Sequence, residues 1–131
     1  MARLLIDSHI FIWLVDGDRR LGQQIKASLA DPLNEPWLSI ASLWELAIKV
    51  SIGKLDPTYL GNGNPMPHLE RAGISLLELH LPHVNAAARL LPHHRDPFDR
   101  MLIAQAIVED MTLVTRDRVF EAYDGLRILW A

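Results

Sequence analysis

The sequence predicts an α/β fold, a sandwich in which a central, mainly parallel sheet is flanked by helices. Short apolar runs, typical of strands buried on both faces, alternate with longer stretches of helical periodicity. The chain has 131 residues, 50% of them apolar, enough for one domain that buries roughly two thirds of its unfolded surface. No repeat, low-complexity tract or interdomain linker divides it. We therefore expect a single domain over residues 1–131.

The N-terminal part is expected to contain two strands and three helices. The first strand is a short, continuous apolar run that ends at Asp7, as expected in a parallel sheet covered on both faces. The helices show apolar residues spaced by three and four, and Gly53 suits the left-handed position beyond the third. We expect strands at 3–6 and 37–40, and helices at 10–14, 21–29 and from near 42 to 53.

The C-terminal part follows one long loop, residues 53–67, which is rich in Gly, Asn and Pro. The last helix has a strong start, with Asp96 as the cap and Pro97 at the first helical position. We expect strands at 74–79, 112–114 and 127–130, and helices at 84–91 and 98–110.

Composition limits the chemistry that the chain can perform. The chain has no cysteine, which removes disulfides and thiolate metal sites and suits a reducing cytoplasm. Any metal must therefore bind oxygen or imidazole. The net charge of -3 gives no bulk positive field to attract nucleic acid. No apolar run approaches the ~20 residues that span a bilayer, so we expect a soluble, cytoplasmic protein without a signal peptide.

Four carboxylates stand out by position. Asp7 ends the first strand and Asp117 follows the strand at 112–114. Since ligands gather at the carboxyl ends of parallel strands, both should face one crevice. Asp99 lies in the first turn of the helix that begins at Asp96, and Glu45 lies in a narrow polar stripe of a largely apolar helix, with Ser42 and Lys49. We expect Glu45 to point inward.

Taken singly, each acid also has a purely structural explanation. Asp7, Asp96 and Asp117 could each cap a helix or turn. Asp99 could complete a capping box with Asp96, and Glu45 could pair with Lys49 four residues later.

Taken together, the acids favour a metal site, because burying several carboxylates without a cation is costly. Oxygen ligands without thiolate indicate Mg²⁺ or Mn²⁺. Such an ion can activate water and stabilise charge on a phosphate, the chemistry of phosphodiester hydrolysis. Arginines interleaved with the acids could hold the phosphate backbone: Arg95, Arg100, Arg116 and Arg118.

Four segments resemble the acidic motifs of PIN domains, and they cover essentially the whole chain. Residues 4–9 (LLIDSH) resemble the opening strand and first aspartate. Residues 42–49 (SLWELAIK) with 53–55 (GKL) resemble the second motif in one branch of VapC-like toxins. Residues 96–106 (DPFDRMLIAQA) resemble the third motif and residues 113–117 (LVTRD) the fourth.

The resemblance implies a PIN-like α/β sandwich and a Mg²⁺- or Mn²⁺-dependent endoribonuclease, the toxin of a toxin–antitoxin pair that a cognate antitoxin silences. It also implies a homodimer. The acidic positions carried over, as catalytic residues and metal ligands, are Asp7, Glu45, Asp99 and Asp117. Ser8, where threonine is more usual, and Thr115 match positions whose hydroxyls orient the site.

For the reaction we expect in-line attack of water on an RNA phosphodiester. Asp7, Asp99 and Asp117 hold one or two metals, and Glu45 binds directly or through water. Asp96 supports the site as the helix cap. Lys49, Arg100 and Arg116 are candidates for contacts with phosphate.

Two other classes of Mg²⁺-binding α/β protein each need a residue that this sequence lacks. Receiver domains need a lysine after a late strand, but the last lysine is Lys54, and dehalogenase-type phosphatases need a second aspartate where His9 stands. A protein-binding module with little nuclease activity and a housekeeping nuclease remain alternatives. An antitoxin groove could be lined by apolar residues of the first two helices, although we expect most of these side chains to pack in the core: Ile10, Phe11, Trp13, Leu14, Leu21 and Ile25.

Several weaker signals favour structural roles. The pair His93 and His94 is more often solvated than functional. The spacing of His80 and His83 occurs in metal sites but has no partner nearby in sequence. The four tryptophans lie in apolar runs and are expected in the core.

Overall fold

The computed structural model describes residues 2–131. Five strands are present: β1 (Ala2–Ile6), β2 (Asn34–Ser39), β3 (Ser75–Leu77), β4 (Thr112–Thr115) and β5 (Arg127–Trp130). The α-helices are α1 (Ser8–Asp16), α2 (Gln23–Ala30), α3 (Ile40–Ser51), α4 (Met66–Ala72), α5 (Leu81–Arg89) and α6 (Pro97–Val108). Two 3₁₀ segments complete the described fold: η1 (Pro57–Gly63) and η2 (Arg118–Ala122).

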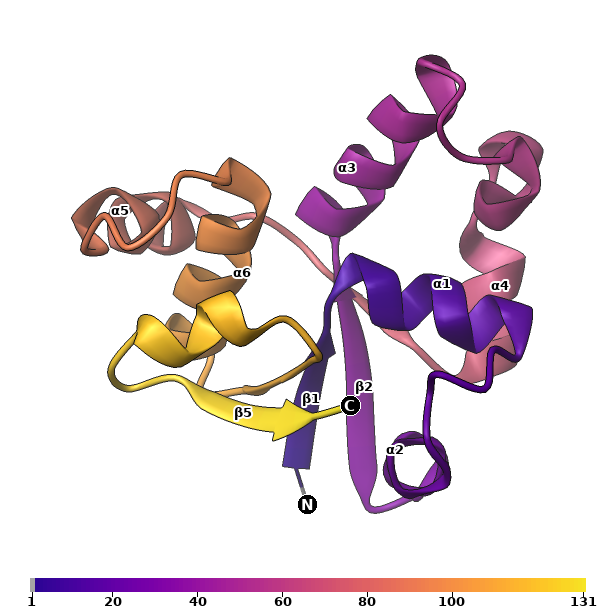
Figure 1. Ribbon diagram of the computed structural model, residues 1–131, viewed down its shortest axis with the longest axis horizontal. Coiled ribbons are helices and arrows are strands. Elements are labelled where there is room, and N and C mark those ends of the chain that lie inside the picture. The colour runs from indigo at the N-terminus through magenta and orange to yellow at the C-terminus, as the bar shows by residue number, and fades with distance from the viewer. Residues whose placement is uncertain (1) are drawn as a thin grey trace.

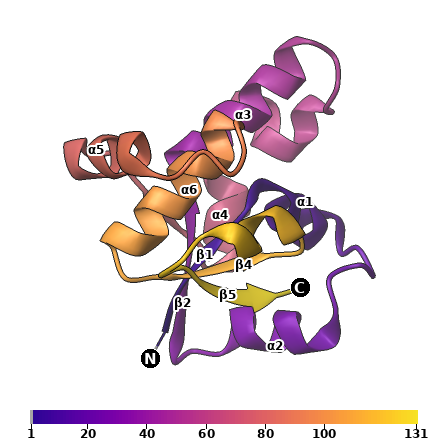
Figure 2. The ribbon, with the colours of Figure 1, turned by 60° about the vertical axis from the view of Figure 1, so that its left-hand side comes forward.

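The strands form one sheet in the order β3-β2-β1-β4-β5, and every neighbouring pair is parallel. The predicted α/β sandwich is confirmed, and its sheet is entirely parallel. Helices α1 and α4 lie on one side of the sheet, and α5 and α6 lie on the other (Figure 1). Figure 2 shows η2 following β4 on its way to β5. Within residues 2–131, no helix is long and apolar enough to cross a membrane.

Each face of the sheet has its own apolar core. Leu4 and Ile6 of β1 point to the face covered by α1 and α2, whereas Leu5 between them points to the face covered by α6. All three side chains are buried, as the period-two alternation of a strand requires when both faces are covered. The continuous apolar run in the sequence therefore has a direct physical cause.

The N-terminal bounds of β2 differ from the prediction of a strand at 37–40. The strand begins at Asn34 and contains Pro36, and Ile40 already belongs to α3. Proline is disfavoured in central strands because it cannot donate to the ladder. Here β3 pairs with β2 only from Trp37 onward, so Pro36 lies before the start of β3 and stands opposite Leu4 of β1 alone.

The long loop expected at 53–67 is wrong in part, because η1 lies inside it and α4 begins at Met66. Leu69 is the one buried residue of this helix, so the sequence shows no apolar periodicity to predict it. Trp44 corrects a second expectation. Its side chain is 63% exposed, although its apolar surroundings in the sequence predicted a core position.

The link between α5 and α6 depends on Arg100. Its guanidinium donates to the carbonyl oxygens of Ala87, Leu90 and Leu91 at 3.0–3.1 Å, and to that of His94 at 3.4 Å. These carbonyls lie at or after the C-terminal end of α5, where helix carbonyls lack intrahelical partners. Arg100 therefore satisfies the end of one helix from the first turn of the next.

Replacing Arg100 with Lys should destabilise the fold, because an ammonium cannot reproduce the planar fork of donors. We expect a loss of about 1–3 kcal/mol in the free energy of unfolding, measured by urea denaturation. Arg118→Lys, at an exposed residue paired with Glu121, is the matched control and should change it by less than about 0.5 kcal/mol. Equal midpoints for the two variants would contradict the structural role.

Candidate active site

Asp7 and Asp117 lie at the same edge of the sheet. Asp7 directly follows β1, and its backbone N–H donates to the carbonyl oxygen of Val114 in β4 at 3.1 Å. Asp117 follows β4 by two residues. Because β1 and β4 are adjacent and parallel, residues far apart in the chain meet where both strands end. The strand order also reverses here, which is where parallel sheets bind ligands.

The carboxylate of Asp7 is buried and held from two sides. Its Oδ1 accepts from the backbone N–H of Ile10 at 2.9 Å, which caps α1, and its Oδ2 accepts from the hydroxyl of Thr115. Burial raises the pKa of Asp7 above its ordinary value, and the hydrogen bonds from Thr115 and Ile10 oppose that rise. Asp7 therefore has the capping role considered from the sequence while facing the same edge of the sheet.

Thr115 connects the two strand-end acids. Its hydroxyl donates to Asp7 and accepts from the backbone N–H of Asp117 at 3.1 Å. Asp117 in turn caps η2, since its Oδ1 accepts from the N–H of Val119 at 3.0 Å. A single buried hydroxyl thus fixes the spacing of both acids.

Glu45 comes to the site from α3, which begins as soon as β2 ends. Its Oε1 accepts a hydrogen bond from the hydroxyl of Ser8 at 2.8 Å, and the residue is half-buried. In residues 2–131, no ion pair joins Glu45 to Lys49. The alternative of a simple helical salt bridge is therefore wrong, and Glu45 points inward as expected.

Asp99 lies at the start of α6, opposite the strand ends. Asp96 caps this helix by accepting from the backbone N–H groups of Phe98 and Asp99 at 2.9 and 3.1 Å. The pKa of Asp99 is raised to about 7, first by burial and then by the negative charges of Asp96, Glu45, Asp117 and Asp7. The structure thus gathers these carboxylates within electrostatic range of one another.

These donors fit a hard divalent cation. The side chains offer carboxylate and hydroxyl oxygens, which Mg²⁺ and Mn²⁺ prefer. The pKa of Asp99 is raised by burial and, after it, by neighbouring negative charges that a cation would neutralise. In the described part of the chain, no three His, Asp or Glu side chains form a ready-made cluster for an ion. Mg²⁺ is usually bound by one or two carboxylates with several waters. Such a site does not need three protein ligands close together.

The predicted basic residues do not share one environment. Arg116 is exposed next to Asp117, and its guanidinium lies 5.6 Å from the ring centre of Trp13, which Arg20 also contacts at 5.0 Å. Lys49 lies one helical turn after Glu45. Arg100, by contrast, is directed to the carbonyls after α5.

Two residues reach the site without having been predicted there. His94 was expected to be solvated, but its side chain is 14% exposed and its Nε2 lies 3.5 Å from Oδ2 of Asp99. Tyr123, after η2, holds the other ring nitrogen of His94 at 2.6 Å. His94 lies two residues before Asp96, the cap of α6, and this position could have indicated that His94 is near Asp99. Nothing in the sequence near Tyr123 indicated its role.

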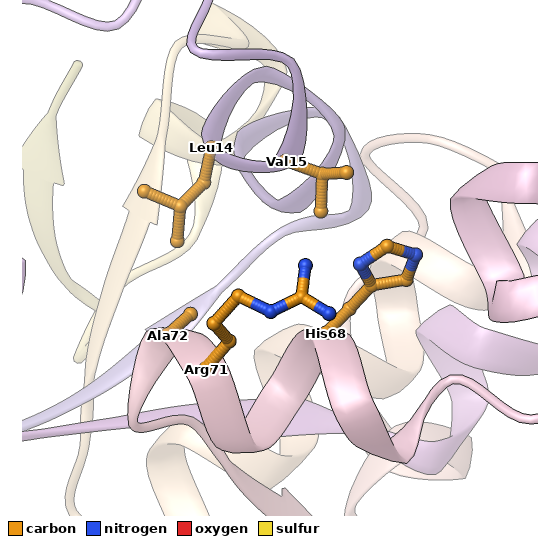
Figure 3. Close-up of a pocket in the computed structure, with 5 residues that line it drawn as sticks. All are labelled: Leu14, Val15, His68, Arg71 and Ala72. Carbon is orange, nitrogen blue, oxygen red and sulfur yellow. The ribbon is translucent and has the colours of Figure 1, made fainter.

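A separate cavity of about 290 Å³ lies between α1 and α4. Leu14 and Val15 of α1 face His68, Arg71 and Ala72 of α4 across it (Figure 3). Leu14 and Val15 are in the last turns of α1, whereas Asp7 caps its first turn, so this cavity is distinct from the acidic site.

Most of the six residues considered for an antitoxin groove on the first two helices pack in the core, which is the role expected for most of them. Four of its six residues are buried in the core, with 0–3% of their surface exposed: Ile10, Phe11, Leu21 and Ile25. They are held there by the sheet face that α1 and α2 cover. Trp13 and Leu14 remain partly exposed.

Solved structures with the same fold all share little sequence with this chain. VapBC2 from Rickettsia felis, solved in complex with a DNA fragment from its own promoter, is 16% identical over 98% of each chain, with a TM-score of 0.74. VapBC-5 from Mycobacterium tuberculosis, a member of the VapBC family of toxin–antitoxin systems, is 20% identical over 100% of each, with a TM-score of 0.66. FitAcB from Neisseria gonorrhoeae is 18% identical over 96% of each, with a TM-score of 0.63.

No curated protein matches the chain. A family model does: the PIN domain model matches residues 4–126. That range holds all four acids described above, begins within β1 and ends just before β5. The chain belongs to the PIN domain family.

Proposed function

We propose that this protein is a Mg²⁺- or Mn²⁺-dependent endoribonuclease that hydrolyses RNA phosphodiester bonds. The observation that carries the proposal is the convergence of Asp7, Glu45, Asp99 and Asp117 at one edge of the sheet, where burial first, and then the charges of Asp96 and of the other three acids, raise the pKa of Asp99 to about 7. Perturbed acids of this kind are typical of functional sites. Membership of the PIN domain family supports a nuclease.

In this proposal Asp7, Asp99 and Asp117 hold one or two cations, and Glu45 binds directly or through water. A divalent ion held by these residues would lower the pKa of a bound water and stabilise the negative charge that builds up on the phosphate. Thr115 fixes Asp7, and Ser8 fixes Glu45. Both hydroxyls orient a carboxylate without neutralising it.

Substrate binding is proposed for Lys49 and Arg116. Arg116 is exposed beside Asp117, and Lys49 lies on the same helical face as Glu45, so both can reach an RNA phosphate bound at the acids. Arg100 is left out of this role because its donors are used by backbone carbonyls. Asp96 supports the site by beginning α6.

We further propose that the chain is the toxin of a cytoplasmic toxin–antitoxin pair. The solved structures that share its fold include VapBC toxin–antitoxin systems. The cavity between α1 and α4, with apolar walls and Arg71, is our candidate contact for a cognate antitoxin.

A homodimer is proposed through an apolar surface on α3 and the start of α6. Four residues spaced by four along α3 and its cap are exposed to 37–63%: Ile40, Trp44, Ile48 and Ile52. Trp44 packs edge-on against Phe98 of α6, with ring centres 5.4 Å apart. Exposed apolar patches of this kind mark interaction sites in soluble proteins.

Asp99→Asn should abolish the proposed cleavage, because it removes a ligand charge from the site while keeping its shape. With purified protein, a mixed RNA pool and Mn²⁺, we expect the rate to fall by about 100-fold or more, and EDTA should stop the wild type. Asp31→Asn is the control, since this exposed residue lies beside the opposite edge of the sheet, before β2. Undiminished cleavage by Asp99→Asn sinks the assignment, and no cleavage by the wild type favours the binding-module alternative.

The pKa of Asp99 also predicts how metal-free stability depends on pH. Because this pKa is raised from 3.8 to about 7 in the folded state, the folded protein holds the proton more tightly than the unfolded chain, and stability falls as pH rises between these values. Without metal, the Tm of the wild type should therefore fall relative to that of Asp99→Asn from about pH 5 to about pH 8.

Saturating Mn²⁺ should then raise the Tm of the wild type more than that of Asp99→Asn, because binding to the native state stabilises it. Scanning calorimetry with and without Mn²⁺ measures both effects. Parallel pH profiles and equal responses to Mn²⁺ would contradict a shared carboxylate site.

Trp44→Glu should weaken the proposed dimer by placing a charge in its apolar surface. Light scattering after size exclusion should give a dimer mass for the wild type and a monomer mass for the variant. Leu33→Glu is the control, because Leu33 is also exposed, at 67%, but lies before β2. A monomeric wild type would refute this contact.

A further inference from the structure

His94 is placed between the proposed metal site and η2. It lies in the turn between α5 and α6, and its Nε2 is 3.5 Å from Oδ2 of Asp99. This nitrogen is buried and has no hydrogen-bond partner in residues 2–131. Unpartnered buried polar atoms are uncommon and call for an explanation.

The ring is held in this orientation by aromatic packing. His94 meets Tyr123 at 71° with ring centres 5.4 Å apart, and Phe120 at 77° with centres 6.2 Å apart. Both aromatic side chains are buried, at 6% and 1% exposed. Two edge-to-face contacts are a favourable arrangement for aromatic rings, so Nε2 stays directed at Asp99.

The contacts of the other ring nitrogen favour one tautomer of His94. The Nδ1 atom of His94 and the hydroxyl of Tyr123 are 2.6 Å apart. Arg100 donates to the same hydroxyl oxygen at 3.5 Å, and a guanidinium can only donate. This contact favours an arrangement in which the phenol accepts from Arg100 and directs its own hydrogen at Nδ1. A neutral imidazole that accepts at Nδ1 carries its hydrogen on Nε2.

We propose that His94 is a positioning residue for Asp99: held by Tyr123 as the Nε2–H tautomer, it donates to Oδ2 of Asp99 and orients that carboxylate for the divalent cation. A small rotation of the carboxylate closes the 3.5 Å separation to a hydrogen bond. The inference rests on the metal site of the proposed function, and it extends that site by two residues. Outer hydrogen bonds to metal-binding carboxylates commonly tune metal affinity.

Two substitutions separate the two ring nitrogens. His94→Gln keeps an amide donor near the position of Nε2, whereas His94→Asn keeps polar atoms only near that of Nδ1. By isothermal titration of Mn²⁺ without RNA, we expect affinity to fall by about 10- to 100-fold in His94→Asn and by only a few-fold in His94→Gln. His93→Asn is the control, because His93 is exposed and packs on Tyr123 without reaching Asp99.

The tautomer is read directly from the nitrogen shifts of His94 in long-range ¹H–¹⁵N spectra. We expect Nε2–H alone in the wild type and a mixture in Tyr123→Phe, which keeps the ring but loses the donor. Nδ1–H in the wild type, equal losses of Mn²⁺ affinity in Gln and Asn, or no Mn²⁺ binding by the wild type would overturn the proposal. Neither readout uses RNA, so Mn²⁺ binding without cleavage would refute the nuclease and leave His94 in place.

Discussion

The parallel pairing of β1 with β4 is the constraint on which the acidic site depends. It puts Ile6 beside Val114, so the residues after both strands leave the sheet at one point. The chain leaves the end of β1 into α1 over one face, and α6, which leads back to the start of β4, lies on the other face and begins opposite the strand ends. An acid at a helix start here both caps its helix and faces the crevice. The structural and functional explanations of Asp7 and Asp117 are therefore compatible.

Local patterns made much of the fold predictable, and non-local contacts explain what was missed. The apolar run of β1 and the Asp96–Pro97 start of α6 each lie within a few residues, and both were recognised. The role of Arg100 was not recognised. Its place among acidic residues in the sequence does not show that the carbonyls at the end of α5 need hydrogen-bond donors. Trp44 failed for a related reason: apolar periodicity gives a helix an apolar face without saying whether the chain itself covers it.

The site residues divide in the same way. The sequence placed Asp7, Glu45, Asp99 and Asp117 at strand ends and on inward helix faces, because each follows a short recognisable pattern. His94 and Tyr123 depend on how η2 packs against the turn before α6, which no local pattern encodes. Their contact joins two loops, the turn between α5 and α6 and the segment after η2. Such contacts are visible only in three dimensions.

The hydrogen bonds of the site preserve its negative charge. Asp7 and Glu45 accept hydrogen bonds from the neutral hydroxyls of Thr115 and Ser8. In residues 2–131 no Lys or Arg forms an ion pair with any of the four acids. A guanidinium beside Asp99 would lower its pKa and cancel the charge that attracts a divalent ion. Keeping Arg100 on backbone carbonyls and Arg116 over Trp13 costs the metal-free fold stability, because the repulsion on Asp99 is left uncompensated. That repulsion is the physical reason for the cation that we propose at this edge of the sheet.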